Sequence, residues 1–147
     1  MKKFAVFVAT TGGPVQIERL TPDNGVKSVV CRSGSTKTLP MTDDYHDFVR
    51  QGTGVVAERF GPLELSSFRA DVDGHIGAGN SWQLPFLIAH AIEAAPNAKL
   101  VKDIEEADHF VWATGKIEHF DLKILQVNNL EDKLVAILEW FKGAKVS

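Results

Sequence analysis

The alternation of hydrophobic and polar residues predicts strands in the first half of the chain. An apolar run, Phe4–Val8, ends at the turn residues Gly12-Gly13-Pro14, and the alternating segment Val15–Leu20 follows it. Two such runs around a short glycine-containing turn are typical of a β-hairpin. Turn signals on either side of β-prone residues indicate further elements: strands at residues 25–31, 54–60 and 63–72, and a short helix over residues 43–51.

The second half of the chain shows the longer period of helices. Residues 81–95 are apolar on nearly every side, which is typical of a helix buried between layers. Residues 130–142 instead carry a single apolar stripe, and short strands are expected at residues 109–113 and 122–127. The order of these elements predicts an α+β fold, in which the two main helices pack on a mostly antiparallel sheet.

Size and composition narrow the classes of protein and partner. Residues 1–147 are expected to form a single domain, and their net charge of −3 provides no basic field for a nucleic acid. Cys31 is the single cysteine, so no intramolecular disulfide is expected, and the five histidines lack the i, i+4 spacing of a helical zinc pair. Neither a metal nor another cofactor is expected. His90 and Trp112 stand among apolar neighbours and are expected in the core or in an interface.

The N-terminus bears on the location of the protein. Met1-Lys2-Lys3 followed by an apolar run has the look of a signal peptide, but the run stops early at a turn and continues into a second strand. No stretch approaches the roughly 18 apolar residues of a membrane span. The sequence therefore predicts a cytoplasmic protein without a membrane partner.

Ser81 and Lys133 are the candidate reactive side chains, one at the start of each long helix. A serine hydroxyl is a weak nucleophile that needs a base, and a lysine is such a base only when burial or a nearby cation lowers its pKa from about 10.4. Lys133 lies at the border of the apolar stripe, which permits this. Gly79 lets a substrate carbonyl approach closely, and backbone N–H groups at the helix start can hold an oxyanion. A structural role fits equally well, with Asn80 or Ser81 as the helix cap and Lys133 in solvent.

Two stretches resemble the proteolytic domain of Lon proteases. Trp112–Ile117, followed by Leu122–Leu134, is similar to the end of that domain. There a Thr-Gly-Glu-Ile turn, a short strand and a Gly-Gly-Leu loop lead to Lys-Glu-Lys-Leu, which holds the catalytic lysine. Upstream, Ala78-Gly79-Asn80-Ser81 before an apolar helix resembles the Asp-Gly-Pro-Ser turn of the family, which holds the nucleophile. The resemblance covers roughly residues 55–145.

The resemblance implies a Lon-like fold, of the ribosomal-protein-type superfold shared with GHMP kinases. It implies that Ser81 is the nucleophile, Lys133 the general base and Thr114 a hydroxyl near the lysine, with Gly79 and Asn80 in the oxyanion loop. The implied function is that of a stand-alone, ATP-independent serine peptidase with a Ser-Lys dyad. Because no ATPase phosphate loop is present, the implied partners are a peptide or unfolded-protein substrate, and either further copies of the chain or a separate ATPase.

Departures from the family pattern keep other interpretations open. Ala78 stands where the family has aspartate, and Asn128-Asn129 replaces the Gly-Gly before the lysine helix, which supports a catalytically inactive fold that serves as a binding or assembly module. A third interpretation takes Gly74–Ser81 as a glycine-rich loop that cradles a phosphate, as in GHMP-type kinases. Trp82 follows the serine where the family has a small residue, so it is expected to narrow the mouth of the site.

Overall fold

The computed structural model describes residues 1–23, 27–50, 56 and 67–115 of the chain. Two helices and six strands form in these residues, together with a 3-10 turn at Ile104–Glu106. In chain order the elements are β1 (Lys2–Thr10), β2 (Gly13–Asp23), β3 (Val29–Arg32), α1 (Thr42–Val49), β4 (Ser67–Val72), α3 (Gln83–Ala94), β5 (Ala98–Leu100) and β6 (His109–Ala113).

The six strands form one mixed sheet. Its order is β3-β4-β2-β1-β5, and β6 also pairs with β1. The β1–β2 and β2–β4 pairs are antiparallel, whereas β3–β4, β1–β5 and β1–β6 are parallel. β5 runs beside Lys2–Phe4 and β6 beside Phe4–Val8, so these two strands follow one another along β1.

The predicted hairpin is present. Thr10 pairs with Gly13, and Val6 with Ile17, across a tight turn in which Gly13 has a φ of 114°. A positive φ of this size is accessible to glycine at little cost, which explains a glycine at this corner. The hairpin supplies the two central strands of the sheet.

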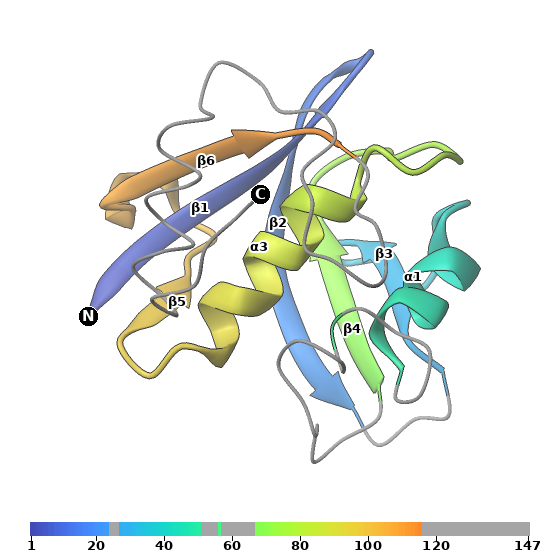
Figure 1. The fold of residues 1–147 in the computed structure, drawn as a ribbon. Helices are drawn as coiled ribbons and strands as arrows, with labels where there is room; N and C mark the ends of the chain where they lie inside the picture. Colours follow the sequence, from blue (N-terminus) through green and yellow to red (C-terminus); the bar gives the residue numbers. More distant parts are fainter. Residues whose placement is uncertain (24–26, 51–55, 57–66, 116–147) are drawn as a thin grey trace.

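Both helices cover the same face of the sheet (Figure 1). α3 packs on β1, β2, β5 and β6, and α1 packs on β3 and β4. On β1 the alternate residues Phe4, Val6 and Val8 are buried in the core. On α3 every residue from Leu84 to Ile92 is buried, which explains why its sequence is apolar on nearly every side.

The observed elements confirm most of the local predictions. The hairpin, the helices expected at 43–51 and 81–95 and the strand expected at 109–113 are all present, with ends that differ by at most a few residues. Within the described residues, the strands expected at 25–31 and 63–72 are present as β3 and β4; residues 25–26 and 63–66 of those ranges lie outside the described part of the chain. Those expected elements that start at residue 122 or later lie outside the described residues. In the range 54–60 only Val56 is described, and it is helical instead of extended.

The direction of the strands differs from the expectation. Three of the five strand pairings are parallel, so the sheet of the described residues is mixed, not mostly antiparallel. β3 and β4 are joined through a segment that contains α1, and a connection of that length lets a chain return in the same direction. Hydrophobic alternation carries no information about strand direction, which explains the error.

Candidate functional site

Ser81 lies on an exposed loop directly before α3. The helix begins at Gln83 rather than at Ser81, and its cap residue is Trp82, with φ −76°, ψ −16° and no side-chain capping hydrogen bond. The structural role considered for Asn80 and Ser81, as a helix cap, is therefore not the observed one. No described residue forms a hydrogen bond with the Ser81 hydroxyl, so the side chain is uncommitted within this part of the chain.

Trp82 fixes the loop to the core. Its side chain is 1% exposed, and its ring makes edge contacts with Phe48 and Phe86, with centroids 5.2 and 5.6 Å apart. The indole Nε1–H donates a hydrogen bond of 2.7 Å to the carbonyl oxygen of Gly79. Trp82 therefore points into the core and does not narrow the mouth of a site at Ser81, which corrects the expectation from sequence.

The segment after β6 is hydrogen-bonded to the loop that carries Ser81 and to the start of α3. The N–H of Gly115 donates a hydrogen bond of 2.8 Å to the Ser81 carbonyl oxygen, and the Gly115 carbonyl accepts one of 3.1 Å from the Leu84 N–H. The Thr114 hydroxyl lies 3.4 Å from the same Ser81 oxygen. The backbone thus joins two segments that are more than 30 residues apart, and Thr114 lies beside Ser81.

The first turn of α3 offers few free donors. The Gln83 N–H is bonded to the Asn80 carbonyl at 3.2 Å, the Leu84 N–H to Gly115, and Pro85 has no N–H. The expected use of the helix start as an oxyanion hole is therefore not available at these three positions. The N–H groups of Gly79, Asn80, Ser81 and Trp82 have no acceptor among the described residues, so the remaining donors come from the loop itself.

The loop has a defined backbone conformation. Gly79 has a φ of +128°, which residues with a side chain rarely adopt, and a Cβ built there would meet no atom within 4 Å. The other end of the loop is held by Asp73, whose Oδ1 accepts a hydrogen bond of 2.7 Å from the Gln16 N–H and whose own N–H donates to the Gln16 carbonyl at 3.2 Å. The conformation of Gly79, not steric crowding, requires glycine.

The sequence-predicted site residues fall into two groups. Ser81, Thr114, Gly79 and Asn80 lie together in the structure, around the bond between Ser81 and Gly115. Lys133 lies outside the described residues, so its separation from Ser81 stays a prediction. Sequence reasoning assigned no role to Gly115 beyond its place in the Thr-Gly pair, although its backbone joins the two segments. The Thr114-Gly115 pair was the sequence signal that could have indicated this role.

A buried ionisable pair joins α1 to α3. Tyr45 Oη and His90 Nε2 are 2.9 Å apart, and their side chains are 0% and 4% exposed. Burial lowers the pKa of His90 to about 3 and raises the pKa of Tyr45 well above its usual range. Both groups are therefore neutral at physiological pH. His90 is a core residue, as the sequence predicted.

Comparisons with known protein families, with curated proteins and with solved structures gave no match to this chain. In the portion of the chain described above, neither helix combines the length and the apolar character needed to cross a membrane. Across the same residues, no three histidine, cysteine, aspartate or glutamate side chains come together as a metal site would require.

Proposed function

We propose that this protein is a Lon-like serine peptidase in which Ser81 attacks a peptide carbonyl and Lys133 takes the hydroxyl proton. The observation that supports the proposal is the 2.8 Å hydrogen bond from Gly115 N–H to the Ser81 carbonyl. It joins the two segments whose sequences resemble the nucleophile turn and the Thr-Gly turn of that family. The finer fold assignment, to the Lon proteolytic domain, is part of the same proposal.

The chemistry divides between the loop and the lysine. Ser81 is exposed, so a peptide can reach its hydroxyl, and its main chain is held by Trp82 on one side and Gly115 on the other. The N–H groups of Gly79 and Asn80 are the proposed donors to the oxyanion, because the donors of the first helical turn are occupied. Lys133 then returns the proton to the leaving amine, which completes acylation; water hydrolyses the ester.

Covalent labelling tests the nucleophile. The wild-type protein treated with a fluorophosphonate probe should gain one adduct by intact mass, and Ser81→Ala should lose it. Ser33→Ala is a matched control, because Ser33 is also exposed but hydrogen-bonds to Glu18. An adduct that persists in Ser81→Ala would remove the peptidase proposal.

Cleavage of an unstructured fluorogenic peptide tests the base. Lys133→Ala and Lys133→Arg should both abolish Ser81-dependent cleavage, because arginine keeps the charge but does not release a proton at ordinary pH. Lys102→Ala, an exposed lysine in the segment after β5, should cleave at the wild-type rate. Equal rates in wild type and Lys133→Arg would exclude a lysine base.

A non-catalytic binding or assembly module is the second candidate. It is favoured by the absence of a described partner for the Ser81 hydroxyl and by the Ala78 and Asn128-Asn129 departures. Under it, neither labelling nor cleavage depends on Ser81. In both proposals the protein binds a peptide or an unfolded protein. It assembles with further copies of the chain or with a separate ATPase. The proposed location is the cytoplasm.

A further inference from the structure

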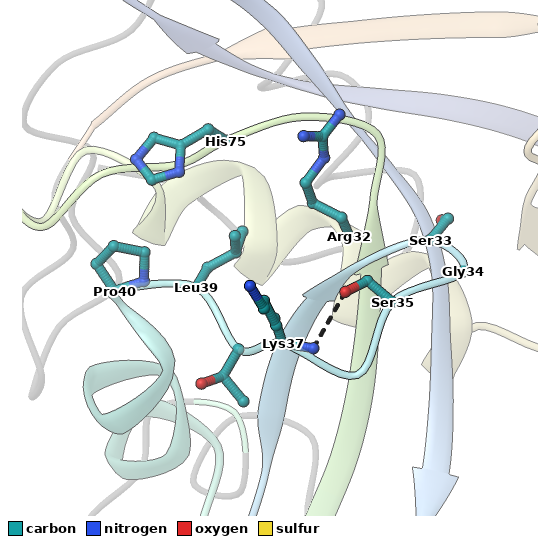
Figure 2. Close-up of a pocket in the computed structure, with 9 residues that line it drawn as sticks. Arg32, Ser33, Gly34, Ser35, Lys37, Leu39, Pro40 and His75 are labelled. Atoms are coloured by element: carbon teal, nitrogen blue, oxygen red, sulfur yellow. Dashed lines mark hydrogen bonds between the residues drawn. The ribbon is translucent and has the colours of Figure 1, made fainter.

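A hollow lies between the segment from the end of β3 to α1 and the loop that follows β4. Its volume is about 470 Å³, within the range of small-molecule sites, and Arg32, Lys37 and His75 contribute to its lining. Figure 2 shows Arg32 and His75 on two sides of this hollow, with Lys37 below them in this view. His75 belongs to the same loop as Ser81, whereas Arg32 is the last residue of β3 and Lys37 lies in the loop that follows it.

The lining is cationic and rich in hydroxyls, and it contains no acidic side chain. Among the described residues, Arg32 and Lys37 form no ion pair, whereas Lys27, Arg50 and Arg69 are each paired with an aspartate. Within the described residues these two cations are thus unpaired in one hollow of a chain whose net charge is −3; the Glu18 carboxylate reaches the lining only through its hydrogen bond with Ser33. Such a concentration of positive charge attracts an anion.

Hydroxyl and backbone groups add hydrogen-bonding capacity to the charge. Ser35 and Thr38 line the hollow, and so does Gly34, which precedes Ser35; its φ is +82°, and a Cβ built there would meet nothing within 4 Å. Leu39 and Pro40 form an apolar part of the wall. Cations, hydroxyl donors and an apolar wall together fit an anionic group carried on an organic body.

The loop is held in this shape before any ligand binds. The Arg69 guanidinium donates a hydrogen bond of 2.7 Å to the Ser35 carbonyl, and its Nε donates one of 3.0 Å to Asp71. At its two ends the Ser33 N–H is bonded to the Val72 carbonyl at 2.9 Å, and the Leu39 N–H to the Val30 carbonyl at 2.8 Å. A preformed site loses less conformational entropy on binding.

We propose that this hollow binds the phosphate group of a small phosphorylated organic molecule. A phosphate monoester carries close to two negative charges at neutral pH and three acceptor oxygens, which matches Arg32, Lys37 and the donors of Ser35, Thr38 and His75. A carboxylate has one charge and two oxygens, so it would leave some of these cations and hydrogen-bond donors without a partner. The proposal does not depend on Ser81 chemistry.

Isothermal titration with phenyl phosphate tests the site at low salt. Wild type and Ser81→Ala should bind it equally, which separates this proposal from the peptidase. Arg32→Gln and Lys37→Gln should each weaken binding by about tenfold or more. Lys102→Gln, an exposed lysine away from the hollow, should bind as wild type does. Amide chemical shifts of Gly34, Ser35 and Lys37 should move on titration in the wild type.

Matched probes distinguish the chemistry of the ligand. Phenylacetate, which replaces the phosphate by a carboxylate, should bind at least about tenfold more weakly, and so should inorganic phosphate, which lacks the organic body. Equal affinity for phenylacetate would overturn the preference for phosphate, and equal affinity for inorganic phosphate would overturn the preference for an ester. No binding of phenyl phosphate at millimolar concentration, or binding that survives both Arg32→Gln and Lys37→Gln, would overturn the site.

Discussion

Tyr45 on α1 and His90 on α3 meet in the core, with the phenol oxygen 2.9 Å from the imidazole Nε2. Their rings are stacked at a centroid distance of 5.9 Å, and Phe68 of β4 contacts the imidazole from another side at 4.9 Å. This polar contact joins the two helices within the hydrophobic core of the described residues. It makes the packing of α1 against α3, and hence the environment of Trp82, depend on a neutral histidine.

The stability of the protein should fall as the pH decreases from 7 toward 5. In the unfolded chain His90 takes up a proton near its ordinary pKa of about 6.5, whereas in the folded protein its pKa is about 3, so the unfolded state binds more protons between these values. The loss from His90 should reach about 2 kcal/mol at pH 5. Urea unfolding at several pH values gives the free energy of unfolding of wild type and of His90→Gln as a function of pH. The contribution of His90 is the difference between the slopes of these two pH dependences. Parallel slopes would show that His90 does not titrate in this way.

Tyr45→Phe should destabilise the fold by about 1–3 kcal/mol, because it leaves the buried His90 Nε2 without its partner. The double variant Tyr45→Phe with His90→Leu removes both polar groups. It should therefore lose less than the sum of the two single variants in a double-mutant cycle by chemical denaturation. Strict additivity would mean that the contact contributes no coupling.

Trp82→Phe should lower the free energy of unfolding by about 1–3 kcal/mol, because it removes the hydrogen bond to the Gly79 carbonyl and part of a fully buried ring. It should also speed amide hydrogen exchange at Leu84, whose N–H is bonded to Gly115 beside the serine loop. Trp112→Phe is the matched control, since Trp112 is 46% exposed on β6, and it should change stability by less than about 0.5 kcal/mol. Equal losses in the two variants would contradict the anchoring role of Trp82.

Gly79→Ala should cost about 1–3 kcal/mol of stability or displace the loop, because alanine is strained at a φ of +128°. Gly77→Ala provides a control in the same exposed loop, where a Cβ meets nothing within 4 Å and φ lies outside the positive range. Thermal unfolding compares the variants directly, and fluorophosphonate labelling reports whether the loop keeps its geometry. A Gly79→Ala protein as stable and as reactive as Gly77→Ala would exclude a required positive φ.

Local pattern predicted the elements that depend on neighbouring residues. The hairpin, α1, α3 and β6 follow from alternation, helical periodicity and turn residues, all of which act within a few positions. β5 was missed because three residues, Ala98-Lys99-Leu100, are too few to show a period. Trp112, expected in the core or in an interface, does not lie in the core: it is on the exposed side of β6, whose alternate residues Val111 and Ala113 are buried. Its place in an interface stays a prediction.

The candidate sites likewise combine residues that short motifs predicted with features that only tertiary contacts establish. Ser81, Thr114, Gly79 and Asn80 were found from short motifs, whereas the inward direction of Trp82 and the occupied N–H groups of Gln83 and Leu84 depend on contacts with α1 and with Gly115. The hollow near Arg32 and Lys37 was not predicted. The run Arg32–Thr38, with two cations and several hydroxyls around a glycine, was a usable signal, but His75 reaches the same hollow only through the fold.

The sequence by itself determined the class of the fold, the position of most elements and the residues able to carry chemistry, because these depend on side-chain type and short-range spacing. Only the tertiary structure decided that three of the five strand pairings among the described residues are parallel, that Trp82 is an anchor and that Gly115 binds the Ser81 backbone. Strand direction, burial and hydrogen bonds between distant segments are set by the free energy of packing the whole chain, which no local pattern encodes.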